Sequence, residues 1–511
     1  MRTGWFQASI ALMALTAFSR LLGYFRDTMI AYRFGASTAT DAFLVAYTVP
    51  AFIVSIIGGA LNSVLVPRVV AHRTQGNEAR AWAIIYAALF WLVVASLVFC
   101  IGFSIVAVPL MDALAPGFPT PEKLLAASLV QVLMAYVFFS IIGFFLGAVL
   151  NAHHRFVYAA IAPSLASLAA VVALLVDAHP AIELVAWALL VGAILQVLLQ
   201  AFPLLPEALR HRRRPPVRDP EMKRMGRLSG PVFLSSAVSS ANIITDRLFA
   251  SLLPTGSVTA LAFSLRVIQV PIGVFGLAVS TVLYPRFAEA LAAGDRPEFT
   301  RLLERGIRLV VLLTFPLTAA LLALSGPLID VLFRHGAFTQ AASSLTALCL
   351  DGFAISLIPS SLLLLLTRAY FTFEATSFVG IVSTFTLVLN AVADYVGAKY
   401  LAAPGIAIAT VLVTGAFMVV LVAGLKRHLP DFTPAGVARS ALPVAVASAL
   451  GGVAAALIAR GVRSVTFPGA ILSGGVGLIA CFAVASLVAL AINVPEARLV
   501  WRRLVTRLMP T

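Results

Sequence analysis

The sequence predicts an all-α polytopic membrane protein, and three observations support this fold class. Of the 511 residues, 61% are hydrophobic and 11% are charged, whereas a soluble protein carries about 25% charged residues. The mean hydropathy is +1.01. Apolar runs of about 20 residues, the length that a helix needs to cross a bilayer, recur along the whole chain. Short alternating segments typical of membrane β-barrels are not apparent.

These runs predict fourteen membrane spans, separated by loops rich in Gly, Pro and charged residues. In chain order, we expect the spans near residues 8–32, 41–67, 81–110, 124–150, 157–177, 182–205, 229–253, 258–285, 306–325, 340–368, 375–397, 403–425, 437–459 and 468–492. The first thirty residues lack a small-residue cleavage site, so we expect the first run to be retained as a span.

The Lys and Arg residues predict the orientation of these spans. Of the 36 Lys and Arg, 26 fall in segments on one side of the membrane and six in loops on the other. Because positively charged loops remain in the cytoplasm, both termini are expected there. The net charge of +15 then reflects topology and contact with anionic lipids on the cytoplasmic side, rather than nucleic-acid binding.

An internal repeat predicts two pseudo-symmetric six-helix lobes. Each copy begins at a neighbouring Asp and Arg within a span and closes on a Pro-Arg pair, with 40 residues from Asp27 to Pro67 and 39 from Asp246 to Pro285. Transporters built from such parallel repeats bind substrate between their halves. The expected domains are an N-lobe at 1–205, a basic linker at 206–227, a C-lobe at 228–428, and two further spans with a basic tail at 429–511.

The first span carries three charged residues among apolar side chains. The stretch reads TAFSRLLGYFRDTMIAYRF and places Arg20, Arg26 and Asp27 within the membrane. An arginine at this depth costs several kcal/mol if it faces lipid, so these residues are expected to face protein, water or an anion. One interpretation is structural, because the neighbours Arg26 and Asp27 balance each other's charge and clamp helices together.

The seventh and eighth spans repeat this pattern with Asp246, Arg247 and Arg266. Neither Arg20 nor Arg266 has an acidic neighbour in the sequence, which favours a functional interpretation. Guanidinium groups form paired, charge-assisted hydrogen bonds with phosphate oxygens and stay protonated. We therefore expect a central cavity that accepts a phosphorylated substrate, lined by Arg20, Arg26, Arg247 and Arg266.

Several further residues have weaker signals. Asp351 is a candidate for ion coupling or for helix packing, and Asp394 is interpreted as a cap near the outer end of its span. Pro271 and Gly273 form a candidate hinge in the eighth span. Cys100, Cys349 and Cys481 lie apart in apolar runs and are expected to be core residues. The adjacent His153 and His154 point to different helix faces, which favours a loop over a metal site.

The sequence resembles the MurJ/MviN family, the lipid II flippases of the multidrug/oligosaccharidyl-lipid/polysaccharide exporter superfamily. The motifs that carry the resemblance are FSRLLGYFRD, FGASTATDAF, GAVLNAHHRF, GSVTALAFSLRVIQVPIGVFG and LSGPLIDVLFRHGAFT. It covers nearly the whole chain and implies a V-shaped fold that moves an undecaprenyl-diphosphate-linked glycan across the cytoplasmic membrane. By the same resemblance, Arg20, Arg26 and Arg266 match cavity arginines of the family. Asp27 and Asp41 match acidic positions of the family. We expect Asp246 and Asp351 to be further acidic residues of the cavity, with a possible role in ion coupling.

The second span departs from this family's pattern. It reads TVPAFIVSIIGGALNSVLVP, without charge, and Gly58 stands where the family carries a glutamate; Leu265 likewise replaces an acidic residue that often precedes the arginine of the eighth span. A paralogue moving another polyprenyl-linked oligosaccharide is therefore an alternative, as are an ion-coupled drug antiporter and a non-transporting scaffold. No enzyme motif and no cofactor are expected, although coupling to a monovalent ion or to the membrane potential is possible in such a transporter. The expected partners are the lipid-linked glycan and membrane lipids.

Overall fold

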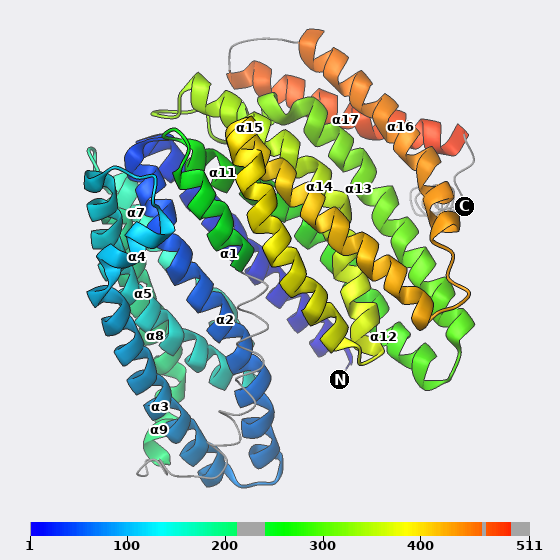
Figure 1. The fold of residues 1–511 in the computed structure, drawn as a ribbon. Helices are drawn as coiled ribbons and strands as arrows, with labels where there is room; N and C mark the ends of the chain where they lie inside the picture. Colours follow the sequence, from blue (N-terminus) through cyan, green and yellow to red (C-terminus); the bar gives the residue numbers. More distant parts are fainter. Residues whose placement is uncertain (1, 212–240, 462–466, 492–511) are drawn as a thin grey trace. The chain divides into compact units, whose positions relative to one another are not determined.

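The computed structural model describes residues 2–211, 241–461 and 467–491, and this part of the chain is helical and contains no strand (Figure 1). Nine of its helices are long and apolar enough to cross a membrane. The chain divides into two compact units, Met1–Val258 and Thr259–Thr511. Most of the linker expected at 206–227, like the C-terminal tail, lies outside the described residues, so the predicted domain division stays a prediction.

The first unit consists of helices that surround one central helix. In chain order its elements are α1 (Arg2–Phe34), α2 (Thr38–Thr74), α3 (Glu78–Ile105), α4 (Ala107–Leu114), α5 (Thr120–Ala152), α6 (Phe156–Ile161), α7 (Ser164–Val176), α8 (Glu183–Ala201), η1 (Phe202–Leu204), α9 (Leu205–Arg210) and a helical segment at residues 241–251. Helix α5 packs against α2, α3 and α8, while α1 packs against α7. The apolar side chains of α5 are therefore covered on several faces, and Leu133, Val137 and Phe145 are fully buried.

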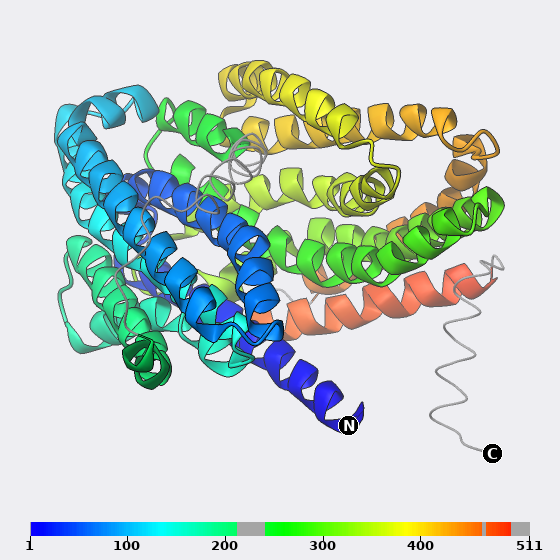
Figure 2. The same ribbon diagram turned by 90° about the horizontal axis from the view of Figure 1, so that it is seen from below.

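The second unit is arranged around α13. Its elements are α11 (Ser257–Pro271, which begins in the first unit), the π-helical turn η2 (Ile272–Gly276), α12 (Leu277–Ala292), α13 (Arg296–Leu332), α14 (Gln340–Thr372), α15 (Thr376–Gly424), η3 (Leu425–Arg427), α16 (Pro434–Gly461) and α17 (Phe467–Ala491). Helix α13 contacts α12, α14, α16 and α17. Figure 2 shows α17 running alongside α13.

Turns in the two predicted repeats have matching backbone conformations, which supports the repeat. Left-handed residues recur at equivalent turns roughly 220 residues apart: Gly35 and Gly256, Gly76 and Gly294, and His154 and Glu374. Gly76 has φ 74° and Gly294 has φ 73°, a region in which glycine lacks the steric cost of other residues. Each of these two glycines precedes an N-cap, Asn77 or Asp295, whose side chain accepts a backbone N–H of the next helix.

Where the structure describes them, the predicted spans correspond to helices, with differences at their ends; of the span predicted at 229–253, only the part from residue 241 is among the described residues. Helix α15 contains two predicted spans, 375–397 and 403–425, joined at Ala402, whose φ of 53° and ψ of −140° break the helical path. Helix α13 continues to Leu332, seven residues past the predicted end at 325, with Pro327 inside it. Neighbouring helices in a membrane protein compensate for the hydrogen bond that such a proline removes, so the proline alone does not end the helix. The three cysteines are buried and unpaired, as expected.

Candidate functional site

Arg26 and Asp27 form a buried ion pair on α1. Arg26 Nη2 donates to Asp27 Oδ1 at 2.7 Å, and Nε donates to the same oxygen at 3.0 Å. The guanidinium lies over the ring of Tyr47 on α2, with 5.6 Å between Cζ and the ring centroid. Both charged side chains are only about one-tenth exposed, at 9% and 10%. In this state Arg26 is neutralised inside the first unit and contacts α2, which is the arrangement expected of a structural clamp.

Arg20 lies in a different environment on the same helix. It is exposed, about two turns before Asp27. Among the described residues it has no ion pair or hydrogen bond with another side chain. In a predicted membrane span, an arginine that faces lipid is costly. Arg20 is thus exposed on the helix on which Arg26 is buried.

Asp41 joins the start of α2 to the turn that precedes α11. It is 1% exposed, and its Oδ2 accepts a hydrogen bond from the backbone N–H of Gly256 at 2.6 Å. Glu122, in the first turn of α5, is also buried and near Asp41. A Cβ atom at Gly117 would collide with the backbone of Ser251 and Leu252. The loops at this end of the unit are therefore in close contact, and sequence reasoning did not identify Glu122.

Asp246 and Arg247 lie on the helical segment at residues 241–251, and both are partly buried. Arg247 Nη1 donates to the carbonyl oxygen of Val258 at 2.8 Å. This bond links the segment to the first turn of α11 across the intervening loop. Asp246 and Arg247 thus repeat the charged pair of α1 in the sequence. Their contacts differ, because Arg247 binds a backbone carbonyl oxygen, whereas Arg26 binds the carboxylate of its neighbour Asp27.

Arg266 is exposed on α11, as Arg20 is on α1. The helix continues from Arg266 into Pro271 and then into the π-helical turn Ile272–Gly276, which contains Gly273. Proline and π-helical turns are two recognised causes of helix bending. Of the two residues that the sequence identified as a candidate hinge, Gly273 lies within this irregular turn and Pro271 directly precedes it.

Buried acidic groups also occur in the second unit. Asp351 is half-buried on α14, and its Oδ1 has no hydrogen-bond partner among the described residues. Asp394 is 0% exposed and accepts a hydrogen bond from Asn390 Nδ2 at 2.7 Å. Asp394 lies about two turns before the break at Ala402, and its interpretation as a cap near the outer end of its span stays a prediction. Its bond to Asn390 joins two residues at i, i+4 spacing, which place their side chains on one helical face.

His153 lies in a loop, as expected, and joins three elements at one end of the first unit. His153 Nε2 lies 3.5 Å from Glu207 Oε2, and Arg155 Nη2 donates to Glu207 Oε1 at 2.6 Å. The ring of His153 packs against Trp82, with centroids 5.5 Å apart. Burial, and to a lesser degree the charge of Arg73, lower the pKa of His153 from its ordinary value. No group of three or more His, Cys, Asp or Glu suited to a metal ion occurs in the described part of the chain.

The comparisons with known proteins agree with these features. The profile of the family described as "Lipid II flippase MurJ" matches residues 30–473. A probable lipid II flippase MurJ from Buchnera aphidicola is 30% identical over 398 residues, which span 76% of this chain and 77% of the relative.

Solved structures show the same fold. A lipid II flippase MurJ in an inward closed conformation is similar with a TM-score of 0.77 and 20% identity, covering 94% of this chain and 99% of that protein. An inward-facing multidrug resistance transporter of the MATE family is similar with a TM-score of 0.69 and 15% identity, over 83% of this chain and 98% of that protein. The chain is a multi-pass, all-α membrane protein, and the profile match over most of its length shows that it belongs to the lipid II flippase MurJ family.

Proposed function

We propose that this chain moves lipid II from the inner to the outer leaflet of the cytoplasmic membrane, with both termini in the cytoplasm. The observation that carries this proposal is the match to the lipid II flippase MurJ family over residues 30–473. The excess of Lys and Arg in one set of loops supports the orientation. The process is transport of an intact lipid and requires no covalent step on the protein.

Within this proposal, Arg20 and Arg266 contact the diphosphate of the substrate. Both are exposed on predicted membrane spans, where an arginine that faces lipid is costly. Each guanidinium can form charge-assisted hydrogen bonds with phosphate oxygens. Arg26 and Arg247 already have partners inside the first unit, and we assign them a positioning role, together with Asp27 and Asp246. Asp351 stays a candidate for ion coupling.

Transport by alternating access requires contacts that form in one state and break in another. Asp41 and Gly256 supply such a contact, because a single hydrogen bond holds the start of α2 to the turn before α11. The close approach of Gly117 to Ser251 adds a second contact at the same end. The turn at Pro271–Gly276 provides a place where the helix can bend. We propose that these loop contacts open, and this turn bends, when the substrate leaves toward the outer leaflet.

The test is the double variant Arg20→Ala, Arg266→Ala, measured by lipid II flipping in proteoliposomes. We expect normal expression and at least a tenfold loss of flipping, since two charge-assisted contacts of about 1.5 kcal/mol or more each are removed. The variant Arg301→Ala is the control, because Arg301 is an exposed arginine on α13 whose ion pair with Glu298 lies at the helix surface. Unchanged flipping in the double variant would contradict the proposal, and loss of folded protein would favour a scaffold role.

The uncharged second span favours a second candidate, a different polyprenyl-linked oligosaccharide as substrate. Gly58, at the position where the family carries a glutamate, is buried, and a Cβ atom there would lie 3.2 Å from the ring of Phe144. This part of α2 thus offers an aromatic neighbour in place of a carboxylate. Depleting the protein and identifying the lipid-linked intermediate that accumulates in the inner leaflet separates the two substrates.

A further inference from the structure

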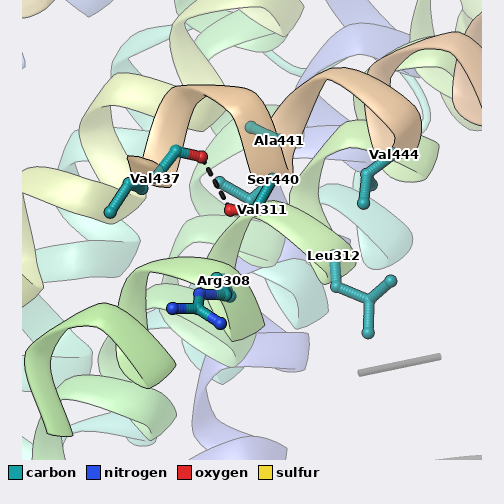
Figure 3. Close-up of a pocket in the computed structure, with 7 residues that line it drawn as sticks. All are labelled: Arg308, Val311, Leu312, Val437, Ser440, Ala441 and Val444. Carbon is teal, nitrogen blue, oxygen red and sulfur yellow. Dashed lines mark hydrogen bonds between the residues drawn. The ribbon is translucent and has the colours of Figure 1, made fainter. Parts of the chain in front are cut away.

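Glu122 is a buried carboxyl group that the proposed transport mechanism does not use. It lies in the first turn of α5 and is 7% exposed. Among the described residues it has no hydrogen bond or ion pair with another side chain. Arg308, which lines the depression between α13 and α16 (Figure 3), differs in this respect, because it donates to Glu304 Oε2 at 2.9 Å. A buried carboxyl group without such a partner favours its neutral form, so Glu122 is a candidate for a residue that holds a proton.

The charges around Glu122 also favour a proton on it. Asp41, at the start of α2, is the charged group that acts on Glu122, and Asp41 is itself 1% exposed. Asp41 Oδ2 accepts the backbone N–H of Gly256 at 2.6 Å. Because an N–H group can only donate, this bond favours the ionised form of Asp41. Two neighbouring buried carboxyl groups do not readily ionise together, so Glu122 is the member of this pair that holds the proton.

Two other effects at this end of α5 do not change this conclusion. Lys123, the residue after Glu122, pairs with Asp112 on α4 at 3.1 Å, so its charge is already compensated. The N-terminus of a helix attracts a negative charge, but this attraction is smaller than the effect of burial beside a like charge. Neither effect replaces the basic partner that an ionised Glu122 would need.

Glu122 and Asp41 lie beside the loop contacts that open in the proposed transport cycle. A Cβ atom at Gly117, in the loop before α5, would collide with the backbone of Ser251. The hydrogen bond from Gly256 to Asp41 adds a second contact. Opening these contacts would expose Glu122 to water and remove the N–H donor from Asp41. An exposed glutamate releases its proton above about pH 4.3, its ordinary pKa. The closed loops thus retain a proton that the open loops release.

We propose that Glu122 is a proton-binding site that couples the closure of these loops to the pH on the outer side of the membrane. This inference rests on the proposed function, which supplies the outer location of the loops and their opening. On opening, the O–H bond of the neutral carboxyl group breaks, the proton passes to the outer solution, and the carboxylate remains. Closure takes a proton from the same side, so the proton regulates transport and does not drive it. Because the closed state binds more protons than the open state, raising the pH favours opening.

The experiment measures the opening of the loops through a buried thiol in the full-length protein. Ser251→Cys places a thiol at a position that is 2% exposed and lies beside Gly117. Thr255→Cys places one at an exposed position in the turn that follows. Both are labelled with a membrane-impermeant maleimide in right-side-out vesicles, and the ratio of the two rates cancels the pH dependence of thiol reactivity. As the pH is raised, we expect this ratio to increase by up to about ten-fold per pH unit, the limit for the release of one proton.

Two substitutions of Glu122 test the origin of this change. Glu122→Gln keeps the shape of the neutral acid and cannot titrate, so its labelling ratio should remain low at every pH. Glu122→Met carries the test if the size-exclusion profile shows that the Gln variant is misfolded. The matched control is Glu298→Gln, which removes a glutamate that lies in the first turn of α13 and pairs with Arg301. It should keep the pH dependence of the wild type.

The inference would be overturned by a ratio that does not change with pH in the wild type, by an equal change in Glu122→Gln, or by loss of the change in Glu298→Gln. Lipid II flipping by the same proteins in proteoliposomes separates this inference from the proposed function. Absence of flipping with an intact change in labelling that depends on Glu122 would contradict the proposed function alone. Flipping with labelling that is independent of pH would contradict the proton site alone.

Discussion

Removing one half of the Arg26–Asp27 pair leaves the other charge buried in α1. Asp27→Asn removes the carboxylate charge that neutralises Arg26, whose side chain is 9% exposed. Loss of one partner from a buried pair costs about 3–5 kcal/mol, so we expect a clear decrease in the free energy of unfolding, measured as a lower thermal midpoint in detergent. Replacing both residues, as in Arg26→Met with Asp27→Leu, should recover most of this loss.

The matched control for this prediction is an exposed pair. Glu298→Gln removes the partner of Arg301 at the surface of α13, and such pairs contribute about 0–1 kcal/mol. If Asp27→Asn is no less stable than Glu298→Gln, Arg26 finds another compensating group and is not a structural clamp. A normal thermal midpoint combined with lost flipping would instead assign Arg26 to the substrate.

The loop after α5 predicts a pH dependence of stability. Burial and the charge of Arg73 lower the pKa of His153 from its ordinary value of 6.5, although the Val149 carbonyl and the carboxylates of Glu207 and Glu78 oppose this shift. The unfolded chain therefore binds a proton that the folded chain does not, between about pH 6.5 and the lowered pKa. Since stability rises with pH wherever the unfolded state binds more protons, it should fall on acidification through this window.

The variant His153→Phe tests this origin, because it removes the titrating ring. The equivalent position after α14 is Phe373, whose ring stacks on His428 with centroids 4.8 Å apart, so an aromatic side chain is compatible with the turn. The thermal midpoint of the wild type should decrease more than that of the variant when the pH is lowered from above to below 6.5. Equal decreases would show that other groups cause the acid sensitivity.

The residue scale also shows which site features the sequence could predict. Arg20 and Arg266 were recognised because a charge within an apolar run is conspicuous in any sequence. The difference between Arg20, which is exposed, and Arg26, which is 7% exposed, depends on the position of Tyr47 on another helix. The Asp41–Gly256 hydrogen bond joins residues 215 positions apart, and local sequence patterns do not contain this information.

At the scale of elements, the break in α15 predicts that replacing glycine by alanine changes the free energy of unfolding differently at two positions of this helix. Gly397 and Gly405 flank Ala402, and a Cβ atom at Gly405 would collide with the carbonyl oxygen of Gly397. Gly405→Ala should therefore cost about 1–3 kcal/mol, the range for overpacking. Gly415→Ala, later in the same helix and with no atom within 4 Å of its Cβ, should be neutral or stabilising by about 0.5–1 kcal/mol.

Thermal unfolding of the two variants checks this prediction. A Gly405→Ala protein as stable as Gly415→Ala would show that the two halves of α15 separate easily at Ala402. The same comparison tests whether the close approach of Gly397 and Gly405 fixes the turn between the two predicted spans.

Hydropathy predicted the existence of these elements better than their ends. Apolar runs predicted the nine helices of the described residues that are long and apolar enough to cross a membrane, because transfer of a helix into the membrane depends on the summed hydropathy of about 20 residues. Helix ends depend on single caps and neighbouring helices, which is why α13 extends past Pro327. The π-helical turn at Ile272–Gly276 was predicted as a hinge at Pro271 and Gly273, but not as a π-helical turn. Gly276, at its end, packs against another helix, since a Cβ atom added there would lie 3.0 Å from the Cα of Ser361.

At the scale of the whole molecule, the repeat was predictable because charged and proline positions recur at equal spacing. The structure adds a second line of support, since the turns themselves match in conformation, as at Gly76 and Gly294. Apolar helical segments resemble one another by chance, whereas a left-handed turn followed by a helix N-cap is a specific local arrangement. Turn chemistry therefore carries more information about the repeat than the spans that it connects.

The repeat and the distribution of positive charge together predict on which side of the membrane each turn lies. Gln75 and Ala293 are exposed at equivalent turns, and Thr255 and Lys399 are exposed at turns predicted on the other side. We expect a membrane-impermeant maleimide to label Thr255→Cys and Lys399→Cys in right-side-out membrane vesicles. Gln75→Cys and Ala293→Cys should react only after the membrane is permeabilised.

The single-cysteine substitutions can be made in the wild-type sequence without removing its own cysteines, because Cys100, Cys349 and Cys481 are buried and buried thiols react slowly. Labelling of Gln75→Cys and Ala293→Cys on opposite sides would refute the parallel repeat, since copies offset by six spans must share one orientation. Labelling of both from outside, with Thr255→Cys protected, would keep the repeat but invert the molecule. An inverted molecule would place the 26 basic residues outside, against the charge bias that orients membrane proteins, so we expect neither result.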